Sequence, residues 1–110
     1  MRLQTDRAFR TENMIRHMVL FAFKPSVDEE LRCKLLAMLA DLPRQFPEMR
    51  GFQLGVNVSK RDNRCSHGMT MSFNTLSDLE NYLNSERHEN LVQENFAPII
   101  KERVIVSIVD

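Results

Sequence analysis

The 110-residue chain is poor in cysteine, glycine and aromatic side chains, and it has no surplus of either charge. It contains no tryptophan and a single tyrosine, and its fifteen basic side chains equal its fifteen acidic ones. Without a net charge the chain has no field that would draw it to a phosphate backbone or an anionic membrane. We therefore expect neither nucleic acid nor a membrane as a partner.

The few cysteines and histidines are spaced in ways that argue against a disulfide framework and a metal centre. Cys33 and Cys65 lie far apart, form no CxxC motif and follow no secretory signal, so two free thiols in a reducing cytoplasm are expected. No two of the three histidines have HxH or HxxxH spacing, which disfavours a zinc site. The longest apolar run, around MVLFAF, is far too short to cross a bilayer. We expect no metal and no cofactor.

Length and hydrophobicity suit one compact domain preceded by a short arm. The chain is 43% hydrophobic, enough to close a single core. Residues 1–13 are mostly polar and can bury little, so they are expected to form a loose arm, of functional or merely extraneous origin. The domain is expected to span residues 14–110.

Four segments have the apolar patterns that are typical of β-strands, and the fourth of them ends the sequence. Residues 15–24 are apolar on both alternating faces, which predicts a strand covered on both sides. Residues 52–58 and 66–73 alternate and are joined by a polar turn, so they predict a hairpin. The β-branched run of residues 103–110 predicts a fourth strand.

Two stretches have helical spacing. The first follows a capping box formed by Ser26 and Glu29 and ends at Pro43. The second begins after a cap at Thr75 or Ser77, but its apolar spacing lapses across NSERHEN, residues 84–90. A broken helix is therefore predicted, with Ser85 capping its second part.

The order β-α-β-β-α-β predicts an α+β, ferredoxin-like domain with a four-stranded antiparallel sheet. Right-handed crossovers place both helices on one face, expected to be the face that carries Phe21, Phe23 and Met71. The other face presents Met18 and Leu20, which are too apolar to leave in water. We therefore predict a homodimer packed sheet to sheet; the alternative is a monomer whose second face is merely mixed.

Several stretches together carry a family likeness. The runs MIRHMVLFAFKP, LGVNVS, SHGMTMSF, LENYLNSERHENL and PIIKERVIVSIVD resemble the stress-responsive A/B barrel (Dabb) family over residues 14–110. The order and spacing of His17, His67, Tyr82 and His88 weigh most in this resemblance. It implies a dimeric α/β barrel made of two ferredoxin-like protomers, which agrees with the argument from the sheet faces.

The resemblance also implies a candidate site. Plant polyketide cyclases of this family work without metal or organic cofactor, and the residues that match His88 and Tyr82 act in them as base and assisting phenol. A further tyrosine that those cyclases carry on the first helix has no equivalent here, because Tyr82 is the only tyrosine. The chemistry fits, since imidazole suits a base near neutral pH and a phenol stays protonated as a hydrogen-bond donor.

Two functions follow, from different classes. The first is a cofactor-independent lyase or cyclase for a small carbonyl or polyketide-like compound, with His88 and Tyr82 catalytic and with His17 and His67 binding the substrate. The second is a non-enzymatic, stress-associated small-molecule-binding or structural homodimer, in which His88 is a solvated residue near a helix cap and His17 and His67 are core histidines. Cofactor-free monooxygenases share the dimeric barrel, but nothing in the sequence singles them out. We expect His17 and His67 to face the helices, but each begins its strand and the two strands are antiparallel, so they should lie near opposite ends of the sheet and need not share one pocket.

Overall fold

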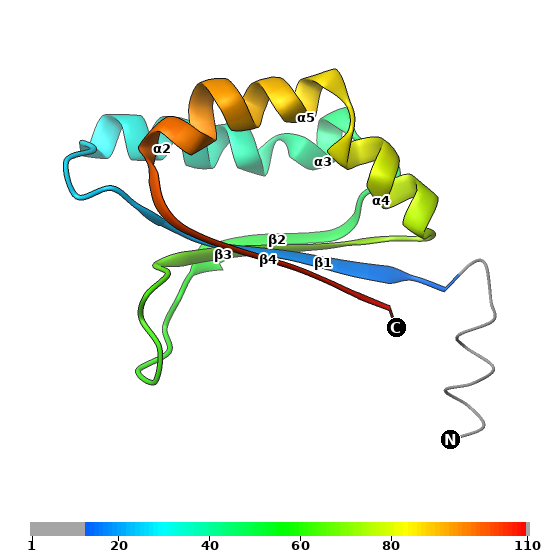
Figure 1. The fold of residues 1–110 in the computed structure, drawn as a ribbon, viewed down its shortest axis with the longest axis horizontal. Coiled ribbons are helices and arrows are strands. Elements are labelled where there is room, and N and C mark those ends of the chain that lie inside the picture. Colours follow the sequence, from blue (N-terminus) through cyan, green and yellow to red (C-terminus); the bar gives the residue numbers. More distant parts are fainter. Residues whose placement is uncertain (1–12, 110) are drawn as a thin grey trace.

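A computed structural model describes residues 13–109, which form one antiparallel sheet with the helices gathered on one of its faces (Figure 1). The elements are β1 (Ile15–Phe23), α2 (Glu29–Ala40), α3 (Leu42–Gln45), β2 (Arg50–Val56), β3 (His67–Phe73), α4 (Leu76–Leu83), α5 (Glu86–Leu91), the π-helix η1 (Val92–Phe96), the 3-10 helix η2 (Ala97–Ile99) and β4 (Ile100–Val109). The strand order is β2-β3-β1-β4. This confirms the predicted ferredoxin-like α+β fold. The predicted arm, residues 1–13, lies outside the described residues except for Asn13 and stays a prediction.

Strand β1 is an inner strand of the sheet, and its side chains alternate between a buried and an open face. Its odd-numbered residues are buried beneath the helices, whereas its even-numbered residues are exposed or half-buried on the other, open face. Phe21 and Phe23 therefore lie in the core, as the alternation predicts, and Met71 of β3 lies on the same face, opposite His17. Within a single chain, however, β1 is covered on only one side.

The register of β1 fixes where the two strand histidines lie. His17 is opposite Met71 of β3 and Ser107 of β4, while His67 is opposite Phe21. Since directly paired residues share a face, both histidines point toward the helices. They lie four positions apart along β1, which confirms that they are near different ends of the sheet.

The helical stretch after β3 is broken as the sequence predicts. Thr75 caps α4 by accepting a hydrogen bond from the backbone N–H of Asp78 at 3.0 Å. Asn84 ends α4, and Ser85 caps α5 by accepting from the N–H of His88 at 3.2 Å. Each hydroxyl satisfies an N–H that has no partner within its own helix.

Some predicted boundaries are wrong. The cap of α2 is Asp28, which accepts from the N–H of Leu31 at 2.9 Å, rather than Ser26, because Ser26 lies in the turn before the helix. Strand β2 is displaced by two residues toward the N-terminus, since Asn57 leaves the ladder to bond the loop that follows. Strand β4 begins at Ile100, three residues before the predicted start.

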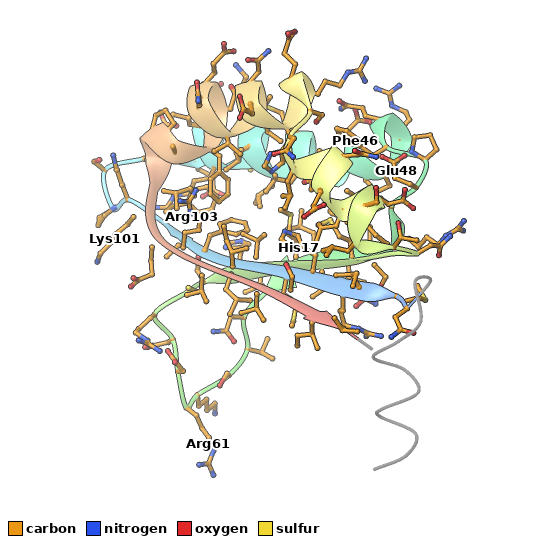
Figure 2. All side chains as sticks on the ribbon, turned by 45° about the vertical axis from the view of Figure 1, so that its right-hand side comes forward. His17, Phe46, Glu48, Arg61, Lys101 and Arg103 are labelled. Carbon is orange, nitrogen blue, oxygen red and sulfur yellow. The ribbon has the colours of Figure 1, made fainter. Side chains whose placement is uncertain are left out.

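The core between helices and sheet is made of aromatic and aliphatic side chains. Its largest fully buried members are Tyr82, Phe21, Phe73, Leu35, Leu39, Met71 and His17. His17 is the one buried residue in this set whose side chain ionises near neutral pH, and Figure 2 shows it between the sheet and the helical layer. Within residues 13–109, every helix is too short or too polar to span a membrane.

Candidate functional site

Tyr82 and His88 lie against each other at the break between α4 and α5. Their ring centroids are 4.7 Å apart, with an angle of 62° between the rings. The Tyr82 ring is also stacked on Phe73 of β3 and meets Phe46 edge-on, at 5.5 Å and 4.8 Å respectively. Only 1% of Tyr82 is exposed, so its ring is fixed by packing on several sides.

The broken helix holds the backbone and the ring of His88 by separate contacts. The Ser85 hydroxyl accepts the N–H of His88 and donates to the carbonyl oxygen of Tyr82 at 2.7 Å. The His88 Nδ1 atom lies 3.1 Å from the carbonyl oxygen of Leu83. Because a carbonyl only accepts, Nδ1 must carry the hydrogen that it donates. In the neutral ring Nε2 is therefore left with its lone pair free.

The surroundings of His88 favour this neutral form. Burial lowers the pKa of His88 below its ordinary value of 6.5, while the hydrogen bond to Leu83 and the carboxylate of Glu89 offset part of that shift. At neutral pH the imidazole is therefore unprotonated, and it presents a basic Nε2 of fixed tautomer.

His17 approaches the same cluster from the sheet. Its Nδ1 shares a hydrogen bond of 2.8 Å with the hydroxyl of Ser107, the residue directly opposite on β4. Burial lowers the pKa of His17, and a positive charge on His88 lowers it further. The two imidazoles are thus close enough that protonating one disfavours protonating the other.

The phenol of Tyr82 stays protonated in this environment. Burial is the single cause that raises the pKa of Tyr82 well above its ordinary value of 10. A neutral phenol beside a neutral imidazole offers one hydrogen-bond donor and one base within a few ångströms. The cluster of His17, Tyr82, His88 and Ser107 is called the polar site below.

His67 is not part of the polar site. Its ring is stacked on Phe21 at 5.5 Å and lies edge-on to Phe23 at the same distance, and its Nδ1 bonds the Ser66 hydroxyl at 2.8 Å. Burial lowers the pKa of His67, and the charge of Arg32 lowers it further. Of the four candidate residues, three therefore lie together in the polar site, and His67 lies apart from His17, as the direction of their strands predicts.

A hollow of about 980 Å³ lies elsewhere, between the open face of the sheet and the loop that joins β2 to β3. Its lining combines apolar residues such as Leu20 and Val104 with polar ones such as Asn57 and Glu102, and it includes His67. Figure 1 shows the β2–β3 loop projecting away from the helices on this side. This hollow therefore does not lie between the second helical stretch and the sheet, where the polar site is.

Ser107 is the site residue that the sequence interpretation missed. It belongs to the polar site through its bond to His17, which is ninety residues away in the chain. One signal was present, because Ser107 is the polar residue inside the apolar run VIVSIV. Among residues 13–109, no group of three or more His, Cys, Asp or Glu side chains is arranged to hold a metal ion.

Comparison with known proteins places the chain in a family. A sequence profile of the stress responsive A/B barrel domain, Dabb, matches residues 15–110. The chain belongs to the Dabb family. Comparison of this Dabb chain with curated proteins gives no match.

Solved structures share the Dabb fold at low sequence identity. A Dabb family protein with a ferredoxin-like fold from Mesorhizobium loti is 18% identical, with a TM-score of 0.80 over 89% of this chain and 97% of that one. The hydroxynitrile lyase from Passiflora edulis is 19% identical, with a TM-score of 0.82 over 90% and 94%. A dimeric ferredoxin-like protein of unknown function from Thermobifida fusca is 19% identical, with a TM-score of 0.77 over 93% and 95%.

Proposed function

We propose that this Dabb protein is a cofactor-independent lyase or cyclase that acts on a small carbonyl compound, with His88 as its base. The observation that carries the proposal is the bond from His88 Nδ1 to the Leu83 carbonyl, which leaves Nε2 as a free lone pair on a ring that burial keeps neutral. His88 is half-buried, and an imidazole of fixed tautomer with a free Nε2 is suited to proton abstraction.

Tyr82 would supply the complementary group. When a base removes a proton next to a carbonyl group, negative charge develops on the carbonyl oxygen, and a neutral donor can stabilise it. The Tyr82 phenol is adjacent to His88 and stays protonated because of burial. The proton passes to His88 Nε2 and can return to carbon or to the leaving fragment, so the cycle needs no metal or organic cofactor.

His17 would orient the substrate from the sheet side. Its bond to Ser107 fixes the ring, and its lowered pKa keeps it uncharged beside His88. His67 would bind substrate only if the ligand extended to the far end of the sheet, where it meets Phe21 and Phe23.

The relatives are consistent with a lyase that works as a dimer. The Passiflora edulis protein is a hydroxynitrile lyase, and cleavage of a hydroxynitrile to a carbonyl compound also begins with loss of a proton to a base. The Thermobifida fusca protein is described as dimeric. We propose that this chain forms a homodimer through the open face of its sheet, where Leu20 is 39% and Val104 42% exposed.

A second function, a non-enzymatic binding or structural dimer, is favoured by the tightness of the polar site. His17 is 2% and Tyr82 1% exposed, and the hollow of about 980 Å³ lies on the other face of the sheet. His88 is half-buried, but an enzyme would need α5 and η1 to move before a substrate could also contact Tyr82 and His17. Five-residue π-helical segments such as η1 often occur at functional sites, which makes this stretch the expected point of movement.

The two functions are separated by an assay of proton abstraction. The exchange of α-protons in a panel of small aliphatic and aromatic ketones can be followed by NMR in D₂O, beside the cleavage of an aromatic hydroxynitrile. The native protein should accelerate at least one reaction, and His88→Gln should lose a factor of about 10²–10⁴, the usual contribution of a general base.

His67→Gln is the matched control, since it removes an imidazole of lowered pKa outside the polar site. It should retain the activity towards small ketones. Native protein that accelerates nothing, or a His88→Gln variant as active as the native chain, would leave the non-enzymatic dimer as the better account.

A further inference from the structure

A second cluster of polar side chains, Arg32 and His67, lies around Phe23 at the far end of β1 from the polar site. The guanidinium carbon of Arg32 is 5.3 Å from the centroid of the Phe23 ring, and the His67 ring meets Phe23 edge-on at 5.5 Å. Both polar side chains are half-buried, so solvent still reaches them. The charge of Arg32 adds to burial in lowering the pKa of His67, so the two groups interact. We call Arg32, His67 and Phe23 the arginine site.

Local contacts hold the Arg32 guanidinium but leave one side of it without a partner. Its Nε donates to the carbonyl oxygen of Val27 at 3.1 Å, and its position over Phe23 adds a cation–π contact. The two Nη groups make no hydrogen bond within residues 13–109. Because no buried side-chain nitrogen of these residues lacks a partner, the Nη groups are open to solvent. Their parallel N–H groups match the two oxygens of a carboxylate.

No acidic side chain of the described residues neutralises Arg32. The side-chain ion pairs described within residues 13–109 involve other arginines. The acids that precede Arg32 in the chain have other roles, since Asp28 caps α2, Glu29 lies 3.6 Å from the Cys33 thiol and Glu30 is exposed. A half-buried guanidinium has lost part of its hydration, and an anion from solution would compensate that loss.

His67 supplies a second hydrogen-bonding group beside the guanidinium. Its ring is fixed by stacking on Phe21, with 14° between the ring planes, and its Nδ1 shares the hydrogen bond with the Ser66 hydroxyl. That hydroxyl can donate or accept, so either tautomer of His67 satisfies it. The Nε2 atom has no partner within the described residues and can donate to an anion when it carries the hydrogen.

The charge of the arginine site matches a carboxylate better than a phosphate. Arg32 provides one positive charge, while His67, whose pKa is lowered, adds a donor but no charge at neutral pH. A phosphate group carries about two negative charges at that pH, and one would remain unbalanced. Phe23 and the half-buried Val27 beside the guanidinium are apolar. They favour a carboxylate that carries an apolar substituent.

The arginine site is separate from the polar site. Phe23 follows His17 by six residues along β1, which is roughly 20 Å at about 3.3 Å per residue. A molecule of the size of benzoate is too short to touch both. The inference therefore goes beyond the proposed lyase or cyclase and does not rest on it.

We propose that Arg32 and His67 bind the carboxylate of a small organic monoacid. The Arg32 Nη groups contact the two oxygens of the carboxylate, His67 donates from Nε2, and the apolar part of the acid lies against Phe23 and Val27. The arginine site belongs to one chain and lies on the helix side of the sheet, so it does not depend on assembly.

The test compares benzoate with benzamide, its uncharged isostere. Binding is followed by two-dimensional NMR of ¹⁵N-labelled protein at constant ionic strength, and the pKa of His67 is measured with and without each probe. The variants are Arg32→Gln and Arg32→Lys. Arg61→Gln is the matched control, because it removes the same charge from an exposed loop residue that Figure 2 shows far from the helices. Circular dichroism checks that each variant is folded.

The native chain should bind benzoate at least about tenfold more tightly than benzamide, and Arg32→Gln should abolish the difference. Arg32→Lys should lie between them, because lysine keeps the charge but loses the paired N–H groups. Arg61→Gln should bind benzoate as the native chain does. Bound benzoate should raise the pKa of His67, because its negative charge stabilises the imidazolium, and should leave the pKa of His17 unchanged.

Equal affinity of the native chain for benzoate and benzamide, or binding of neither, would overturn the proposal without any variant. A loss of benzoate binding in Arg61→Gln as large as in Arg32→Gln would overturn it too, since net charge alone would then explain binding. Inorganic phosphate is the third probe, and tighter binding of phosphate than of benzoate would rule out a monocarboxylate site. These measurements use no turnover, so their failure would leave the proposed role of His88 untouched.

Discussion

Three histidines with lowered pKa values make the stability of the folded chain sensitive to acid. Burial is the main cause for His17, His67 and His88 alike. The unfolded chain takes up these protons near pH 6.5, whereas the folded chain resists them until lower pH. The unfolded state then binds more protons, so the free energy of unfolding falls as pH falls below about 6.5.

Thermal unfolding between pH 7.5 and 5 should therefore show a melting temperature that drops toward acid. His17→Gln removes one of the groups responsible, so its melting temperature should depend less steeply on pH than that of the native chain. The comparison concerns slopes, because a buried glutamine has its own cost. Equal slopes would mean that His17 titrates alike in the folded and unfolded chain.

Tyr82 combines a packing role with a proposed chemical one, and two substitutions separate them. Tyr82→Phe keeps the ring between Phe46 and Phe73 and should cost less than about 1.5 kcal/mol in the free energy of unfolding. Tyr82→Ala should cost about 3–5 kcal/mol, as for other buried aromatic rings. Denaturant unfolding measures both.

The activity of Tyr82→Phe then decides the role of the phenol. If the hydroxyl stabilises a developing oxyanion, this stable variant should lose most of its turnover. Turnover equal to that of the native chain in Tyr82→Phe would restrict Tyr82 to packing.

At the scale of elements, helix caps fix the position of the base. Ser85 and Asp28 cap α5 and α2 respectively, and Ser85 bonds the backbone N–H of His88 itself. Ser85→Ala and Asp28→Ala should each cost about 1 kcal/mol in the free energy of unfolding. Only Ser85→Ala should also change the His88 titration, because the broken helix would then hold the ring less firmly. A His88 titration unchanged in Ser85→Ala would show that the Leu83 bond alone positions it.

Hydrophobic periodicity was enough to predict the order of the elements but not all of their ends. The strands and helices follow alternation and helical spacing, and the break at NSERHEN was visible as a lapse in that spacing. Ser26 and Asp28 are both cap-forming residue types, so sequence could not choose between them. The π-helix at Val92–Phe96 was not foreseen, since its apolar spacing over five residues does not differ from that of an α-helix.

The candidate site, like the element boundaries, could be predicted from the sequence only in part. Tyr82 and His88 are close in sequence, and their neighbourhood follows from the helix break. The separation of His17 from His67 followed from the antiparallel direction of β1 and β3. Two contacts could not be predicted. The bond of Ser107 to His17 depends on the register of β4, and the bond of His88 Nδ1 to the Leu83 carbonyl oxygen depends on local backbone geometry.

For the whole molecule, the distribution of apolar surface favours assembly. One face of the sheet is buried under helices, while the other face and the β4 edge expose apolar side chains and a hollow. A stable dimer should make the melting temperature depend on protein concentration, because dissociation accompanies unfolding. A series from micromolar to millimolar protein should show the temperature rising with concentration. A constant value over this range would contradict a dimer that dissociates on unfolding.

The central claim is that His88 is a neutral base with its proton on Nδ1. The most direct measurement is an NMR titration of the ¹⁵N-labelled imidazole rings from pH 5 to 9, with assignments from His88→Gln. The account predicts a pKa for His88 below 6.5 and a protonated Nδ1 with unprotonated Nε2 at pH 7. It also predicts that these signals move when a small ketone binds. A His88 that titrates near 6.5, carries its proton on Nε2 and ignores every ketone would contradict it.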